Sequence, residues 1–237
     1  MKNSDEFLEF YNKIDLYLRM EGNYDSNTSF TYKIKNSSNK AAIRFKEDLI
    51  SLGELRNAIV HNPKVGENAI AEPHDKTVDL IKKIYFEITD PKKVIPKFQF
   101  EVLGAEKEDY INDILVEMKN YSFSQFPVYN QEGEIIELIN TNTISRWLSS
   151  QIEEKGTIII ENVKVKDLLS EIEFKKNYKF ISRNTSIYDA YYLFISQINE
   201  KKRNLDVLFI TNSGKEQETL LGLITIEDIA NLINKPS

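Results

Sequence analysis

The chain has 237 residues, enough for one large or two ordinary domains with well-buried cores. Apolar residues make up 41% and charged residues 29%, which is typical of a folded globular protein and excludes a disordered, collagen-like or coiled-coil chain. The net charge is -6, and there is no cysteine, so the sequence excludes disulfides, thiol nucleophiles and iron–sulfur clusters. With only His61 and His74 available, we expect no metal site.

Charge and hydropathy also bear on location and partners. No apolar run approaches the ~18 residues of a membrane span, and the polar start lacks the apolar core of a signal peptide, so we expect a cytoplasmic protein without membrane contact. Residues 1–95 hold 15 basic and 15 acidic residues, so the excess of acid lies in the rest of the chain. A solvated helix face or a nucleic-acid contact would each explain the local cluster of Arg44, Lys46, Arg56 and Lys64.

The first 90 residues have the apolar spacing of helices. We predict a helix over 5–20, a long polar connection over 22–40, a second helix from 39 to 62 that Pro63 ends, and a third from 74 to 90. Residues 1–90 are therefore predicted to form an all-helical bundle.

A basic linker with two prolines, residues 91–97, separates this bundle from a different pattern. Beyond it, the order strand, helix, hairpin, helix occurs twice, in residues 98–150 and, after a lead-in segment, in residues 151–235. The first repeat is predicted to begin with a strand over 98–104. The fold class is therefore multidomain, α and α/β: an N-terminal helical bundle followed by two β-α-β-β-α repeats that pack against one another.

The repeated unit resembles the CBS domain pair, or Bateman module. Its most specific element runs from Gly222 to Ile229, with a hydroxyl at Thr225 and a carboxylate at Asp228. The resemblance implies that Thr225 approaches the phosphates or ribose of an adenine nucleotide and that Asp228 accepts hydrogen bonds from the ribose hydroxyls. A helix N-terminus that offers N–H groups, with an aspartate nearby, suits such a ligand.

The same resemblance implies which other residues border that cleft: Phe123 and Ser124 from the first copy, with Leu103 near its start. The first copy departs from the pattern, because Asn140 stands where the hydroxyl is expected and Thr143 where the carboxylate is expected. We therefore expect one nucleotide cleft and one altered or empty cleft. The implied regulatory ligand is AMP, ADP or ATP, while S-adenosylmethionine and a cyclic dinucleotide suit the same residues.

A structural interpretation competes with this one. Thr225 is also a good helix cap, and acidic residues such as Glu227 and Asp228 are favourable in a first helical turn. On this interpretation both clefts are empty and the repeats are a scaffold.

A second motif, Arg56-Asn57-Ala58-Ile59-Val60-His61, lies near the end of the second predicted helix. It resembles the Arg-Asn-x-x-x-His signature of HEPN domains, helical units many of which are metal-independent RNases that pair two motifs across a dimer. Helical spacing places Asn57 and His61 on one face, whereas Arg56 lies about 140° away and reaches them only by its length or from another subunit.

The residue types suit RNA cleavage. His61 would be the general base toward the 2′-hydroxyl of RNA, Arg56 would bind the phosphate, and Asn57 would orient the imidazole or the substrate. The alternative is a motif that only holds a dimerisation or partner-docking bundle together. We predict that His74 is an exposed loop residue and Trp147 a core or interface residue.

Together these patterns predict a homodimer in which an adenine nucleotide on the repeats regulates a candidate endoribonuclease, with RNA as substrate. The alternative is a non-catalytic nucleotide sensor.

Overall fold

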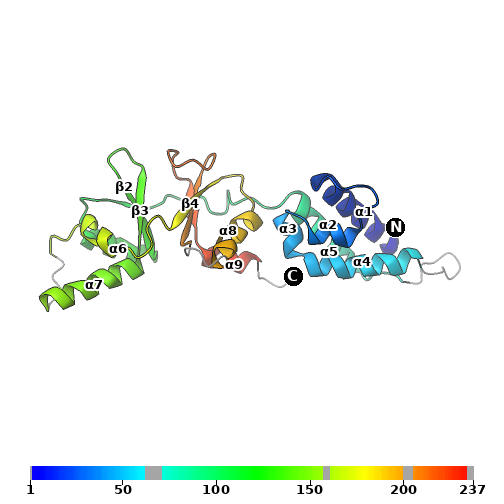
Figure 1. Cartoon of the computed structure of the whole chain (residues 1–237), viewed down its shortest axis with the longest axis horizontal. Coiled ribbons are helices and arrows are strands. Elements are labelled where there is room, and N and C mark those ends of the chain that lie inside the picture. The colour runs from blue at the N-terminus through cyan, green and yellow to red at the C-terminus, as the bar shows by residue number, and fades with distance from the viewer. Residues whose placement is uncertain (1, 62–70, 157–160, 200–204, 234–237) are drawn as a thin grey trace. The chain divides into compact units, whose positions relative to one another are not determined.

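The computed structural model describes residues 2–61, 71–156, 161–199 and 205–233. The chain divides into two compact units, Met1–Lys92 with Ser186–Asp189 and Lys93–Thr185 with Ala190–Ser237. Figure 1 labels the helices and strands of each unit. Within the described ranges, no helix is both long enough and apolar enough to cross a membrane.

The first unit is helical, with α1 (Asn3–Glu21), α2 (Phe30–Lys35), α3 (Lys40–Arg44), α4 (Lys46–His61) and α5 (Asp75–Thr89). The predicted helices over 5–20 and 74–90 correspond to α1 and α5. Both bury one face at helical spacing, because the side chains exposed by 7% or less recur three or four residues apart: Phe7, Tyr11, Ile14 and Leu18 in α1, and Val78, Ile81, Ile84 and Ile88 in α5.

The predicted polar connection over 22–40 is wrong, because it contains α2. The Ser29 hydroxyl caps this helix by accepting a hydrogen bond from the Tyr32 N–H at 3.2 Å. Lys33 is only 2% exposed and forms an ion pair with Asp15 of α1. A pattern of apolar residues could not reveal this helix, since one of its anchors is a buried lysine.

The predicted continuous helix over 39–62 is also wrong, because the chain forms α3 and α4 with Phe45 between them. The Phe45 N–H still bonds the Ala41 carbonyl at 3.0 Å, and the Phe45 carbonyl accepts from Leu49 at 2.9 Å. The interruption is thus one residue wide and leaves the apolar periodicity intact. The predicted end at Asn62 and Pro63 lies outside the described residues.

The second unit contains two repeats with the predicted order of elements. The first consists of β1 (Ala105–Glu106), α6 (Ile111–Tyr121), β2 (Gln125–Tyr129), β3 (Ile135–Asn140) and α7 (Thr141–Lys155). After the 3-10 helix η1 (Val165–Glu171), the second consists of β4 (Tyr178–Ser182), α8 (Ile187–Asn199), β5 (Val207–Thr211), β6 (Gly222–Ile224) and α9 (Ile226–Ile233). In each sheet the first two strands are parallel and the last two antiparallel.

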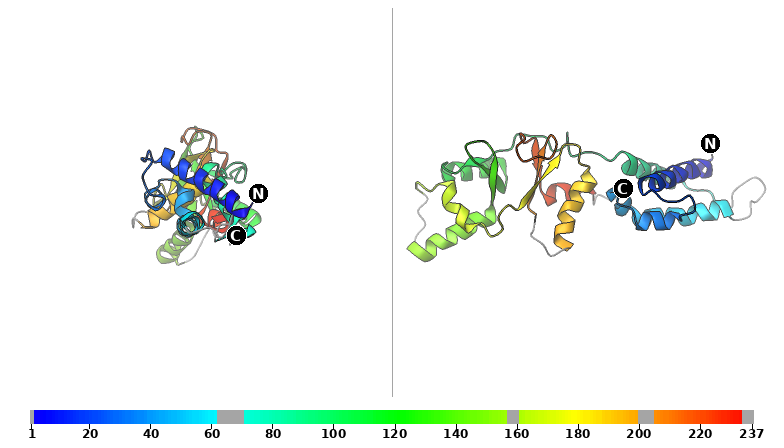
Figure 2. Two further views of the ribbon diagram at one scale, coloured as in Figure 1. Left: turned by 90° about the vertical axis from the view of Figure 1, so that its right-hand side faces the viewer. Right: turned by 45° about the horizontal axis from the view of Figure 1, so that its top comes forward.

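The two sheets lie next to each other, with α6 and α7 beyond the first and α8 and α9 beyond the second (Figures 1 and 2). Apolar side chains from both repeats form the cluster between them: Ile135, Leu138, Tyr178, Val207 and Phe209. The Tyr178 hydroxyl donates to the Ile135 carbonyl at 3.4 Å. The repeats therefore share a core, as expected for two units that cannot each bury their apolar faces alone.

The strand predicted over 98–104 is wrong, since sheet pairing in the first repeat begins at Ala105. Residues 98–100 instead contact the second repeat, where the Phe100 N–H donates to the Leu221 carbonyl at 3.1 Å. Phe98 is 8% exposed and its carbonyl lies against Gly222. The alternation of this segment thus does not mark a strand of the first sheet: Phe98 is buried, whereas Phe100 is 48% exposed.

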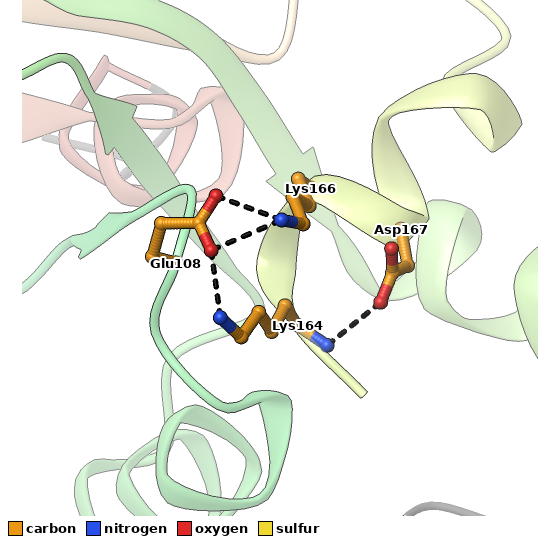
Figure 3. A network of polar contacts seen from close by, with 4 residues as sticks. All are labelled: Glu108, Lys164, Lys166 and Asp167. Atoms are coloured by element: carbon orange, nitrogen blue, oxygen red, sulfur yellow. Dashed lines mark hydrogen bonds and ion pairs between the residues drawn. The ribbon is translucent and has the colours of Figure 1, made fainter. Parts of the chain in front are cut away.

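An ionic network fastens η1 to the loop after β1 (Figure 3). Glu108 accepts from the ammonium groups of Lys164 at 2.7 Å and Lys166 at 2.8 Å. The Asp167 carboxylate accepts from the backbone N–H of Lys164 at 2.9 Å. The hydrogen bonds from the Lys164 and Lys166 side chains lower the pKa of Glu108 to about 2.

Candidate functional site

A cleft of about 420 Å³ opens at the start of α9, between that helix, the lead-in to β1 and the segment between α6 and β2. The five residues predicted to border the nucleotide line it: Leu103, Phe123, Ser124, Thr225 and Asp228. They come from three separate parts of the sequence, so the packing of the two repeats brings them together. A volume of this size falls in the range of about 300–1,000 Å³ typical of small-molecule sites.

Thr225 and Asp228 hold the N-terminus of α9. Asp228 Oδ2 accepts from the Thr225 backbone N–H at 2.9 Å and from its hydroxyl at 2.7 Å. The Asp228 N–H in turn points to the Thr225 hydroxyl oxygen at 3.4 Å. The pair is therefore a reciprocal helix cap. Both bonds that the carboxylate accepts from Thr225 end on Oδ2, so Oδ1 is available on the exposed side chain.

Aromatic side chains that the motif did not identify complete the cleft. Phe100 and Tyr121 both line it and are 48% and 69% exposed, which is unusual for large apolar side chains. Ser122 ends α6 in the left-handed region with φ of 57°, and the chain turns there toward Phe123. The only signal in the sequence was proximity, because Tyr121 and Phe100 stand two and three residues from predicted cleft residues.

The corresponding place in the first repeat is closed. Asn140 caps α7 by accepting from the Thr143 N–H at 2.9 Å, and its amide donates to the Asp206 carboxylate at 2.8 Å. The remaining cavity is about 20 Å³, roughly the space of one water molecule. Asn177 lines it with a buried Oδ1 that has no hydrogen-bond partner within the described ranges. The space left between the described residues is therefore too small for a nucleotide.

In the helical unit, the three motif residues lie together near the end of α4. Arg56 Nη1 is 3.0 Å from His61 Nε2 and donates to Asn57 Oδ1 at 3.2 Å. The long Arg56 side chain thus reaches around α4 to His61 within one subunit. Because a guanidinium can only donate, Nε2 of His61 is the acceptor in this contact.

Tyr11 of α1 also contacts the Arg56 side chain. The guanidinium carbon lies 5.7 Å from the centre of the Tyr11 ring, within the range of a cation–π contact. Burial, chiefly, and the nearby charge of Asp15 raise the pKa of Tyr11 to about 12, although Arg56 opposes the shift. Tyr11 was not identified from the sequence, where it reads as one more apolar position of α1.

The remaining single residues lie as predicted. His74 is exposed at the residue before α5, and Trp147 is 4% exposed in the core of the first repeat. Across the described ranges, no group of three or more histidine and acidic side chains converges to hold a metal ion.

Neither a protein-family model nor a curated protein matches this chain. Several of the solved structures that match are described as CBS-domain proteins. A CBS domain-containing protein from Kribbella flavida is 10% identical with a TM-score of 0.43, covering 58% of this chain and 96% of its own. The CBS domain of a bacterial CNNM/CorC family Mg²⁺ transporter in complex with ATP is 15% identical with a TM-score of 0.41, covering 67% and 96%.

A third match is a CBS domain pair in complex with 5′-methylthioadenosine and S-adenosyl-L-methionine. It is 11% identical with a TM-score of 0.38, covering 60% of this chain and 95% of its own.

Proposed function

We propose that the two repeats are a CBS domain pair whose cleft at the start of α9 binds a ligand containing adenosine, and that this ligand regulates the helical unit. One observation carries the proposal: the residues expected from the CBS motif, drawn from three parts of the sequence, line a single cleft. The helix cap alone would explain Thr225 and Asp228, but it would not explain why Leu103, Phe123 and Ser124 lie around them.

The chemistry of the cleft suits a nucleoside. Phe100, Tyr121 and Phe123 offer apolar rings for a purine base. The available Oδ1 of Asp228 can accept from a ribose hydroxyl while Oδ2 keeps the cap. The closed cleft in the first repeat leads to an expected stoichiometry of one ligand per chain.

The test is a binding titration, supported by thermal denaturation, with adenosine, AMP, ADP, ATP and S-adenosylmethionine. A ligand at ~100 times its dissociation constant stabilises the folded protein by about 2.7 kcal/mol, which corresponds to a few degrees. Asp228→Asn keeps an oxygen for the cap but removes the charge, and we expect it to weaken binding at least about tenfold. Thr143→Ala, at the matching position of the closed cleft, should bind as the wild type does. Absence of any binding would leave the scaffold interpretation.

A second function, for the helical unit, is metal-independent RNA cleavage. It is favoured by the cluster of Arg56, Asn57 and His61. The imidazole would take the proton of the RNA 2′-hydroxyl, the 2′-oxygen would attack the adjacent phosphorus, and the 5′-oxygen would leave with a proton from water, giving a cyclic phosphate. Arg56 covers His61 Nε2 in the structure, so an incoming phosphate would have to draw the guanidinium away and free the base.

This proposal is tested by incubating the protein with RNA in EDTA, with and without an adenosine ligand. Cleavage to cyclic phosphate ends that His61→Ala abolishes and His74→Ala keeps would support it. No cleavage by a folded wild type would support the non-catalytic sensor instead. A homodimer is part of both proposals, and its mass in solution tests it directly.

A further inference from the structure

The cleft at the start of α9 is acidic. Three carboxylates line it, those of Glu101, Glu227 and Asp228, and all three residues are exposed. No lysine, arginine or histidine is among the described residues that line it. A ligand that carries phosphates would bring further negative charge to this place, and none of those lining side chains is positively charged to neutralise it.

The N-terminus of α9 compensates for only part of this charge. A helix N-terminus attracts anions through its free N–H groups and its dipole. In α9 the Asp228 carboxylate already accepts from the backbone N–H and the hydroxyl of Thr225, and Glu227 adds a second negative charge in the same turn. An incoming phosphate would therefore approach this helix end against two carboxylates of the protein.

A divalent ion could in principle bridge acidic residues to phosphates. A preformed site for such an ion requires several donors to converge on one point. Glu101 belongs to the lead-in to β1 and Glu227 and Asp228 to α9, and no set of three acidic or histidine side chains in the described ranges converges in this way. A magnesium ion that arrives with the phosphates needs only one or two carboxylates, and titration of ATP with and without Mg²⁺ distinguishes that case. Toward a ligand without such an ion, the three carboxylates act as a negative field around the apolar side chains of the cleft.

We propose, on the basis of the adenosine site above, that this cleft selects adenine nucleosides that lack phosphate and carry no charge or a positive one, with a sulfonium nucleoside bound most tightly. The aromatic residues would hold the base, Asp228 the ribose, and Glu101 and Glu227 would attract the cation and repel anions. This narrows the ligand class that the motif leaves open, from any adenosine derivative to the unphosphorylated ones.

The experiment is isothermal titration of the full chain with four probes at one ionic strength: S-adenosylmethionine, 5′-methylthioadenosine, AMP, and ATP with and without Mg²⁺. We expect affinity to fall in that order, with AMP at least about tenfold weaker than 5′-methylthioadenosine. Raising the salt concentration should reduce the differences between charged probes and leave the neutral probe unchanged. AMP or ATP binding as tightly as the neutral nucleoside would overturn this inference while the adenosine site stands. If no probe binds, the proposed site itself fails.

Glutamate-to-glutamine variants test whether the charge of the cleft, and not its shape, sets the preference between ligands. Glu227→Gln and Glu101→Gln each remove one charge with little change of volume, so each should bring the affinities of AMP and S-adenosylmethionine closer by several-fold. Glu117→Gln, on α6 and outside the cleft lining, is the matched control and should change neither. An unchanged preference in both cleft variants, with binding retained, would also overturn the inference.

Discussion

The two repeats contain the same elements in the same order, but the cavities at the start of their last helices differ. At the start of α9 the cleft measures about 420 Å³, whereas at the start of α7 about 20 Å³ remains. Both places follow the last strand of a three-stranded sheet with the same strand order. A repeated topology therefore repeats the position of a site but not the site itself, because the side chains decide whether the space stays open.

Three pairs of residues differ between the two places. Thr225 corresponds to Asn140, since each is the residue directly before the last helix of its repeat, and Asp228 corresponds to Thr143. Ser124 precedes β2 as Asp206 precedes β5. In the closed cleft the Asn140 amide donates to the Asp206 carboxylate at 2.8 Å, and this bond spans the space. In the open cleft Ser124 is shorter than Asp206, and Asp228 bonds to Thr225 of its own helix cap, so neither side chain crosses the space.

The lead-in segments also dock differently on the partner repeat. The carbonyl of Phe98 lies against Gly222, where a Cβ atom would come within 1.8 Å of it. At the corresponding position of β3, the carboxylate of Glu137 accepts from the Lys176 N–H at 2.7 Å. One lead-in thus approaches backbone to backbone, and the other is held by a buried side chain.

The largest effect is expected for Gly222→Ala, which places a methyl group on the Phe98 carbonyl and forces β6 and the lead-in apart. The free energy of unfolding should fall by about 3 kcal/mol, measured by urea denaturation. Gly53→Ala in α4 is the control, because its Cβ would only touch Phe30 at 3.4 Å, and it should stabilise the protein by about 0.5–1 kcal/mol. If Gly222→Ala unfolds with the same free energy as the wild type, the Phe98 carbonyl and Gly222 lie farther apart in solution than in this structure.

Glu137→Ala should come next. Glu137 is 8% exposed, and the change leaves the Lys176 N–H without its acceptor, so we expect a loss of about 2 kcal/mol in the same measurement. Glu137→Gln keeps an acceptor oxygen and should lose less than about 1 kcal/mol. Equal losses in the two variants would show that the charge matters more than the hydrogen bond.

The third prediction converts the closed cleft into a copy of the open one. The combined change Asn140→Thr, Thr143→Asp and Asp206→Ser shortens the two side chains that meet across it, Asn140 and Asp206, and installs the capping pair of the open cleft, at a loss of about 1 kcal/mol. If the side chains alone close the site, titration with the best adenosine ligand should rise from one to two sites per chain. An unchanged stoichiometry would assign the closure to the lead-in backbone of residues 172–177.

The smallest effect concerns pH. Hydrogen bonds from Lys164 and Lys166 lower the pKa of Glu108 to about 2, below its ordinary 4.5, so the folded state holds fewer protons there than the unfolded state. The stabilisation is complete above pH ~4.5 and is lost as the pH falls toward 2. Glu108→Gln should therefore lower the melting temperature at pH 6 by a degree or less, since the pair is exposed, and should reduce the loss between pH 5 and 3. If Glu108→Gln and the wild type lose the same stability between pH 5 and 3, the ion pairs of Glu108 with Lys164 and Lys166 do not contribute to stability.

A similar carboxylate in the second repeat provides a comparison. Glu218 accepts from the hydroxyl and backbone N–H of Ser213, both at 2.6 Å, and these bonds lower its pKa to about 2. Its acid sensitivity does not depend on a lysine. Added salt should therefore weaken the contribution of Glu108 more than that of Glu218.

The sequence alone determined the large regular elements and the identity of the motif residues. Apolar periodicity predicted α1 and α5, because one face of each is buried and its side chains recur at a fixed spacing. Apolar runs on either side of turn residues predicted both hairpins. Helical geometry limited Arg56 to reaching His61 by its length or from a second subunit, and the structure has it reach within one chain. Local spacing is sufficient for such statements, since they concern neighbours along one element.

Only the tertiary structure decided where these elements meet. It revealed α2, whose buried Lys33 depends on Asp15 of another helix, and it moved the first strand of the repeats beyond residues 98–104. It also placed Phe100 and Tyr121 at the open cleft and Asp206 in the closed one. Each of these features depends on contacts between residues far apart in the chain, and periodicity along the sequence carries no information about such contacts.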